Sequence, residues 1–198
     1  MNLPNKITLA RIFLSIVLLI LLIFPFELCG ITFPKYGPYF GHVILDLKYL
    51  IAGGIFLVAS VTDSLDGHIA RKYGLVTDFG KVMDAIADKM LVNGTLIVLA
   101  CNQMINVAIP VIIITRDIAV DSIKMVAGSK GKTVGASILG KLKTICMMSG
   151  LTLVFAYNLP FEIWHVPVAD ALLYIATVLS IISGIQYYTV NKEYFKEK

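Results

Sequence analysis

Long apolar runs separated by short polar breaks dominate the chain. Each run has about 18–22 residues, which as a helix is long enough to cross a hydrocarbon core of about 30 Å. The runs are Thr8–Phe26, Val43–Val61, Gly80–Cys101, Val107–Val126, Ala136–Ala156 and Val168–Tyr188. We therefore expect an all-α integral membrane protein with six transmembrane helices. All six belong to one bundle, so residues 1–198 are predicted to form a single domain.

Composition supports this prediction. Of the 198 residues, 58% are hydrophobic and 15% are charged, and the mean hydropathy is +0.83. A soluble domain usually carries about 45–50% apolar and about 25% charged residues. The stretch from Gly30 to Gly41 is rich in glycine and proline, and we expect it to be a surface loop between the first two helices.

The distribution of lysine and arginine predicts the orientation in the membrane. Basic residues cluster before the first run, between the second and third, around the connection of the fourth and fifth, and after the sixth. The opposite side carries only Lys35 and Lys48. Cytoplasmic segments are enriched in lysine and arginine, so both termini should be cytoplasmic. The basic face would meet anionic lipid headgroups or a phosphorylated substrate.

Carboxylates follow the second run directly and lie within the third, in helices where a lipid-facing surface should have none. Asp63 and Asp66 are three residues apart, and Asp84 and Asp88 are four apart. Each pair therefore shares one face of its helix. A charged side chain near the bilayer centre costs about 2.5–3.5 kcal/mol and usually faces a cavity or the bundle interior. If the two faces oppose each other, four carboxylates converge on one site.

Four neighbouring carboxylates cannot all stay ionised without a compensating charge, because each raises the pKa of the others. Two divalent ions would supply four positive charges against four negative ones. An all-oxygen, carboxylate-rich site suits Mg²⁺ or Mn²⁺. The alternative, that these aspartates cap helices at the membrane surface, does not account for their spacing. A divalent-cation or proton-coupled transporter would also use intramembrane acids. The acids here cluster toward one face, however, and we see no second acidic set.

The spacing of these residues resembles a family signature. The pattern Asp63-x2-Asp66-Gly67-x2-Ala70-Arg71-x8-Gly80-x3-Asp84-x3-Asp88 matches the signature of the CDP-alcohol phosphotransferases at eight positions across 26 residues. The stretches from Asn2 to Arg11 and from Gly140 to Thr144 resemble the bacterial branch that makes phosphatidylglycerol phosphate. With six expected spans in both, the resemblance covers essentially the whole chain.

The resemblance implies a role for each position of the signature. Asp63, Asp66 and Asp84 would bind metal, and Asp88 would be the general base that also contacts the second metal ion. The CDP-binding residues would be Asp63, Asp66, Gly67, Ala70, Arg71 and Gly80. The implied reaction transfers a phosphatidyl group from CDP-diacylglycerol to glycerol 3-phosphate and releases CMP. Inositol phosphate, serine or phosphatidylglycerol, the last as in cardiolipin formation, are alternative acceptors.

An acceptor with a phosphate group needs its own basic pocket. Arg116 lies inside the fourth run, and its planar guanidinium suits a phosphate. We expect it to face a cavity, because Asp117 and Asp121 are poorly placed on the helix to pair with it. Lys124, Lys141 and Lys143 are the other candidates, and the alternative for these lysines is that they only set membrane orientation.

The resemblance also implies where the protein acts and with what. It predicts a bacterial plasma membrane protein with its active site facing the cytoplasm, and a homodimer. Small residues in the third to fifth runs would permit close helix packing. No nucleic acid is expected as a partner.

Overall fold

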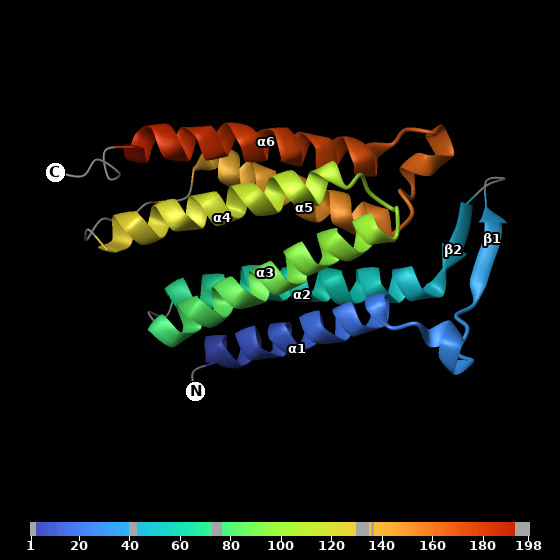
Figure 1. Cartoon of the computed structure of the whole chain (residues 1–198). Coiled ribbons are helices and arrows are strands. Elements are labelled where there is room, and N and C mark those ends of the chain that lie inside the picture. The colour runs from blue at the N-terminus through green and yellow to red at the C-terminus, as the bar shows by residue number, and fades with distance from the viewer. Residues whose placement is uncertain (1–2, 40–42, 73–76, 130–134, 136, 193–198) are drawn as a thin grey trace.

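Six long helices form the molecule, and a short β-hairpin lies at one end (Figure 1). The computed structural model describes residues 3–39, 43–72, 77–129, 135 and 137–192. Within these ranges the side chains of residues 3, 4, 39, 43, 64–72, 78 and 81 are not described. The helices are α1 (Leu3–Ile23), α2 (Leu47–Lys72), α3 (Asp78–Cys101), α4 (Ala108–Ser129), α5 (Ile138–Phe155) and α6 (Val168–Asn191).

The helices pack as two groups of three. In one group α1 packs against both α2 and α3, and in the other α6 packs against both α4 and α5. Contacts of α2 with α5 and of α3 with α4 join the groups. In Figure 1 the ends of α2, α4 and α6 and the starts of α1, α3 and α5 all lie at one end of the bundle. That end carries the signature residues and most of the basic residues.

Part of the stretch expected to be a loop is β-structure instead. Strand β1 (Lys35–Tyr39) pairs antiparallel with β2 (Val43–Asp46), with Lys35 opposite Asp46. The two tyrosines of β1 and the valine–isoleucine pair of β2 are residue types that favour strands. The glycine and proline of this stretch predicted a loop and did not reveal the pairing. Short 3₁₀ helices flank the bundle at η1 (Phe26–Cys29) and η2 (Phe161–Trp164). The all-α prediction therefore holds for the bundle but not for this outer hairpin.

Side-chain hydroxyls fix the starts of two helices that build the site. Thr77 precedes α3, and its Oγ1 accepts a hydrogen bond from the backbone N–H of Gly80 at 3.0 Å. Ser137 precedes α5, and its Oγ accepts from the backbone N–H of Gly140, also at 3.0 Å. Each cap satisfies an N–H group that has no partner within its helix.

Apolar side chains lie both inside and outside the bundle. Leu18, Phe56, Leu96, Leu151 and Leu173 are fully buried in one core. Large apolar residues are also exposed along the helices, which is expected of a surface that faces lipid. Helices α1, α5 and α6 are long and apolar enough to cross a membrane. The molecule is thus a multi-pass helical membrane protein.

Candidate active site

The structure brings together aspartates from two helices around a buried arginine of a third. Arg11 of α1 forms ion pairs with Asp63 of α2 and with Asp84 of α3. The Arg11 side chain is fully buried, whereas those of Asp63 and Asp84 are 35% and 53% exposed. The predicted convergence of the two acidic helix faces is therefore present for this pair. Both carboxylates remain accessible from outside.

Several signature residues lie outside the described side chains. The backbone of Asp66, Gly67, Ala70 and Arg71 continues α2 as helix. Their side-chain positions do not belong to the described part of the structure, so their predicted roles in metal and CDP binding stay predictions.

The donor chemistry at this site fits a hard divalent cation. Asp63 and Asp84 offer oxygen ligands that already gather around one positive charge. Asp88 follows Asp84 by one helical turn on the same helix. Among the described side chains, no three potential ligands are gathered closely enough to form a complete site. The buried Arg11 also changes the charge balance predicted from the aspartates alone, because it supplies one positive charge itself.

Gly80 lies against the N-terminal helix. A Cβ atom at Gly80 would come within 2.7 Å of Asn5 Oδ1 and 2.9 Å of Thr77 Oγ1. Asn5 is itself buried, and its amide nitrogen lies 3.2 Å from Thr77 Oγ1. Such distances are shorter than real Cβ atoms show, so an alanine at Gly80 would force the side chain of Asn5 or Thr77 to shift. The packing of α1 on α3 therefore gives Gly80 a structural role in addition to the predicted nucleotide contact.

A cavity of about 250 Å³ opens beside the aspartates, between α3, α4, α5 and α6. Four basic side chains that the sequence nominated as an anion site line it: Arg116, Lys124, Lys141 and Lys143. Of the described aspartates in the signature, Asp88 lines it too. Asp88 interacts electrostatically with Arg11 and Asp84, and also with Lys143 and Asp117. Asp88 thus connects the aspartate cluster to the basic cavity.

Arg116 is held in place by three residues. Its Nε donates to the Ser180 backbone carbonyl at 3.2 Å, and one Nη donates to Ser183 Oγ at 2.8 Å. The other Nη contacts Asp117 Oδ1 at 3.0 Å. The expectation that Asp117 is a poor partner was therefore wrong. Neighbouring helical residues do diverge, but the long arginine side chain reaches around the turn to the adjacent carboxylate.

Two acidic residues of α4 balance the cations of the cavity. The Nζ atom of Lys143 is 2.8 Å from each oxygen of Asp117, and the Lys143 side chain is only 5% exposed. Asp121 forms an ion pair with Lys89 of α3 and lies 4.0 Å from Lys124. Asp117 therefore contacts both Arg116 and Lys143. Positive and negative side chains thus lie next to each other along the cavity wall.

Tyr187 of α6 forms part of the cavity wall. Its hydroxyl donates to the Gly135 carbonyl at 2.7 Å and accepts from the Ser137 N–H at 3.0 Å. The guanidinium of Arg116 and the ammonium of Lys124 lie 5.6 and 5.8 Å from the centre of its ring. Cations at this distance from an aromatic face are attracted to it. Tyr187 thus ties the start of α5 to two of the cavity's cations.

Sequence reasoning missed several residues of this site, among them Arg11, Lys89, Asp117 and Tyr187. Arg11 was given no site role, although it is a cation within an apolar run. A usable signal was present in its neighbours. Thr8 and Ser15 lie three residues before and four after it, and all three are buried on one face of α1. For Tyr187 we find no signal in the sequence, because the residues that it hydrogen-bonds, Gly135 and Ser137, lie about 50 positions away, just before α5.

Comparison with known proteins identifies the family of the chain. Residues 1–183 match the sequence profile described as CDP-alcohol phosphatidyltransferase. This chain belongs to the CDP-alcohol phosphatidyltransferase family. The chain is 37% identical over 195 residues to a CDP-diacylglycerol–glycerol-3-phosphate 3-phosphatidyltransferase of Bacillus subtilis, covering 98% of this chain and 97% of the relative.

Two further proteins are similar to part or all of the chain. A CMP-forming cardiolipin synthase of Oryza sativa is 38% identical over 152 residues, covering 68% of this chain and 46% of that protein. The crystal structure of the Mycobacterium tuberculosis phosphatidylinositol phosphate synthase in its apo form has a TM-score of 0.62 at 17% identity. It covers 100% of this chain and 94% of the solved chain, and it shows that this phosphatidyltransferase shares its fold.

Proposed function

We propose that this chain transfers the phosphatidyl group of CDP-diacylglycerol to glycerol 3-phosphate, forming phosphatidylglycerol phosphate and CMP. The observation that carries this proposal is the cavity that Asp88 lines together with five basic side chains, four of which are the predicted anion site. Its volume of about 250 Å³ is below that of pockets that bind drug-sized ligands, which are about 300–1,000 Å³. A small acceptor such as glycerol 3-phosphate suits this volume. The similarity to the Bacillus subtilis enzyme over nearly the whole of both chains supports the same acceptor.

The chemistry needs one base and one anion site. The acceptor hydroxyl attacks the phosphorus that carries the diacylglycerol, the bond from that phosphorus to the bridging oxygen breaks, and CMP leaves with the bond's electrons. Asp88 takes the hydroxyl proton. Arg116, Lys124, Lys141 and Lys143 bind the acceptor's phosphate and hold its hydroxyl near Asp88. Positioning of this kind supplies much of the rate when the base is weak.

The donor side of the site is proposed from the signature. Asp63, Asp66, Asp84 and Asp88 would hold divalent metal, Mg²⁺ or Mn²⁺, of which two ions are expected by resemblance. Bound metal would neutralise the diphosphate and stabilise the leaving oxygen. Gly67, Ala70, Arg71 and Gly80, with Asp63 and Asp66, would contact the CDP moiety. The donor's acyl chains would stay in the bilayer beside the exposed apolar helix faces.

Membrane topology and assembly complete the proposal. All six helices cross a bacterial plasma membrane, both termini are cytoplasmic, and the active site opens to the cytoplasm. The positions of lysine and arginine support this orientation. Fusion of reporter domains to the C-terminus tests it, since a periplasmic-active phosphatase there must remain inactive. A homodimer is carried over from the family resemblance, and cross-linking within the bilayer tests it.

One assay tests the proposed activity. Purified protein is incubated with CDP-diacylglycerol, Mg²⁺ or Mn²⁺, and each acceptor in turn: glycerol 3-phosphate, inositol phosphate, serine and phosphatidylglycerol. Release of CMP is expected with glycerol 3-phosphate and only in the presence of metal. Preference for phosphatidylglycerol would favour cardiolipin formation, a possibility kept open by the similarity to the Oryza sativa enzyme. Metal flux into liposomes with no CMP release would indicate a transporter and refute the proposal.

A further inference from the structure

Arg11 has no place in the chemistry proposed above, yet it is the most buried charge of the site. Its side chain is fully buried, and its ion-pair partners are Asp63 and Asp84. Its Nε makes no hydrogen bond to any other described residue. The Ser15 hydroxyl donates to the Arg11 backbone carbonyl at 2.8 Å and so does not compete for the guanidinium. Among the described side chains, these two carboxylates are the ones that pair directly with Arg11, and Asp88 adds a further electrostatic interaction.

Arg11 is buried, whereas its two partners Asp63 and Asp84 are partly exposed. Asp63 and Asp84 are 35% and 53% exposed, so a ligand from the site can reach them while Arg11 stays behind. A buried charge is tolerated only when it is paired. Arg11 in turn offsets one of the two negative charges that α2 and α3 bring together. The pairing is thus mutual, and it joins α1 to both helices.

We propose that Arg11 is the counter-cation of the metal-free aspartate site, holding Asp63 and Asp84 together before a divalent ion binds. This inference rests on the proposed metal site. Arg11 is a positioning residue, because it acts through the two carboxylates and not on the substrate. A divalent ion that shares these oxygens weakens their attraction to Arg11. By linkage, Arg11 must weaken the binding of the divalent ion to the same degree.

This reciprocity predicts that removing Arg11 strengthens the binding of the divalent ion. Removing Arg11 destabilises the metal-free protein more than the metal-bound protein, because the metal replaces the missing charge. Arg11→Gln should therefore lower the melting temperature in EDTA and increase the stabilisation gained from Mn²⁺. A residue that merely packed the helices would lower the melting temperature equally with and without metal.

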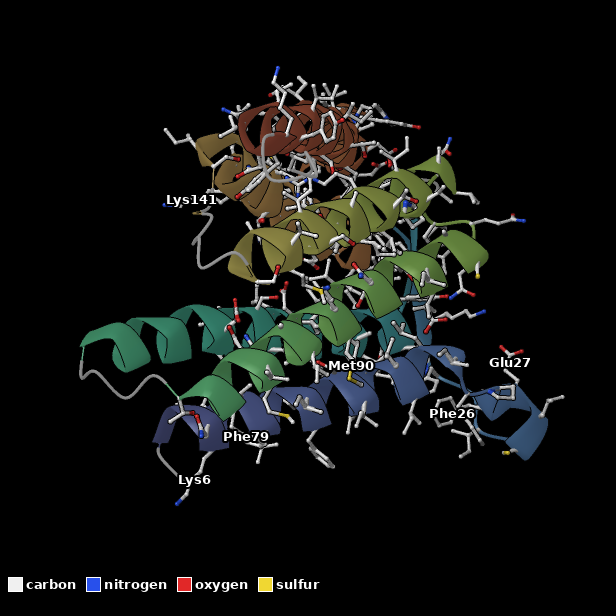
Figure 2. The ribbon with its side chains drawn as sticks, turned by 60° about the vertical axis from the view of Figure 1, so that its left-hand side comes forward. Lys6, Phe26, Glu27, Phe79, Met90 and Lys141 are labelled. Atoms are coloured by element: carbon white, nitrogen blue, oxygen red, sulfur yellow. The ribbon has the colours of Figure 1, made fainter. Side chains whose placement is uncertain are left out.

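The test measures thermal stability of the full chain in mild detergent, by heating and size-exclusion chromatography, across a Mn²⁺ titration. We compare wild type with Arg11→Gln and Arg11→Lys. Lys6→Gln is the matched control, because Lys6 is exposed on the same helix and Figure 2 shows it pointing away from the bundle. Half-maximal stabilisation of Arg11→Gln should need roughly fivefold less Mn²⁺ than wild type. Arg11→Lys keeps the charge but loses the planar guanidinium that contacts two carboxylates, so its Mn²⁺ requirement should lie between those of wild type and Arg11→Gln. Lys6→Gln should change nothing.

The outcomes separate this inference from the proposed function. If wild type gains no stability from Mn²⁺ or Mg²⁺, the proposed metal site fails. If wild type is stabilised but Arg11→Gln needs the same Mn²⁺ concentration or more, the metal site stands and the counter-cation role is overturned.

A folding failure of Arg11→Gln is also informative. If Arg11→Gln and Arg11→Lys both aggregate in EDTA, Asp84→Asn is combined with Arg11→Gln. Removing one carboxylate removes the charge that Arg11 balances, so the double variant should recover a folded peak. Continued aggregation of the double variant would contradict the proposal.

Discussion

Lys143 is buried and pairs with the half-buried Asp117, with the lysine Nζ 2.8 Å from both carboxylate oxygens. Asp117 also contacts Arg116, so one carboxylate faces two cations of the proposed phosphate site. An anion entering the cavity must therefore approach a fixed negative charge. This relationship makes Asp117 a determinant of how strongly the cavity binds phosphate.

Asp117→Asn should strengthen acceptor binding. The amide keeps an oxygen that accepts hydrogen bonds from Arg116 and Lys143, but it removes the repulsion between carboxylate and phosphate. We expect the KM for glycerol 3-phosphate to fall roughly threefold or more, since juxtaposed like charges oppose binding. Steady-state CMP release at varied acceptor concentration measures this. A raised KM would mean that the charge of Asp117 is needed to orient its two cations. Asp170→Asn, in the first turn of α6, is a control outside the cavity lining.

Lysine at position 116 should not restore acceptor binding. The guanidinium contacts Ser180, Ser183 and Asp117 at once, and an ammonium group cannot reproduce this planar arrangement. Both Arg116→Lys and Arg116→Ala should raise the KM for glycerol 3-phosphate about tenfold or more, the size expected for a lost charge-assisted hydrogen bond. The KM for CDP-diacylglycerol should stay near its wild-type value. Equal effects on both substrates would argue against a site for the acceptor alone.

Asp88→Asn should abolish turnover while sparing donor binding. The substitution preserves size but removes the proton acceptor at the edge of the cavity. General-base catalysis contributes about 10²–10⁴ in rate, so kcat should fall by this factor. Binding of CDP-diacylglycerol, measured by protection against heating, should persist. Normal turnover in Asp88→Asn would remove Asp88 from its proposed role.

Gly80→Ala distinguishes two explanations of a signature glycine. A Cβ there collides with Asn5 and Thr77, and overpacking of this kind typically costs about 1–3 kcal/mol. We expect a lower melting temperature without ligands, partly restored by adding Asn5→Ala, which removes the closest atom. A variant with unchanged melting temperature and a raised KM for CDP-diacylglycerol would instead favour the nucleotide-contact role implied by the family resemblance.

Most of the fold could be predicted from local patterns. The apolar runs located the six helices to within a few residues at most boundaries, and the acidic spacing placed Asp84 and Asp88 on one face of α3. Helix length and side-chain periodicity depend on the near neighbours in the chain, which the sequence contains directly. The pairing of β1 with β2 was missed because it joins two separate segments, and neither segment by itself has a pattern that predicts a strand.

The candidate site, like the fold, has features that the sequence predicted and features that it did not. The sequence by itself determined the resemblance to the family, predicted the aspartate set, and nominated four of the basic residues that line the cavity. Only the tertiary structure decided what these residues meet. It placed Arg11 of α1 between Asp63 and Asp84, set Asn5 against Gly80, and gave Asp117 two cations from different helices. Ion-pair partners and close approaches depend on which helices pack together. That arrangement follows from burial over the whole bundle and not from any single segment.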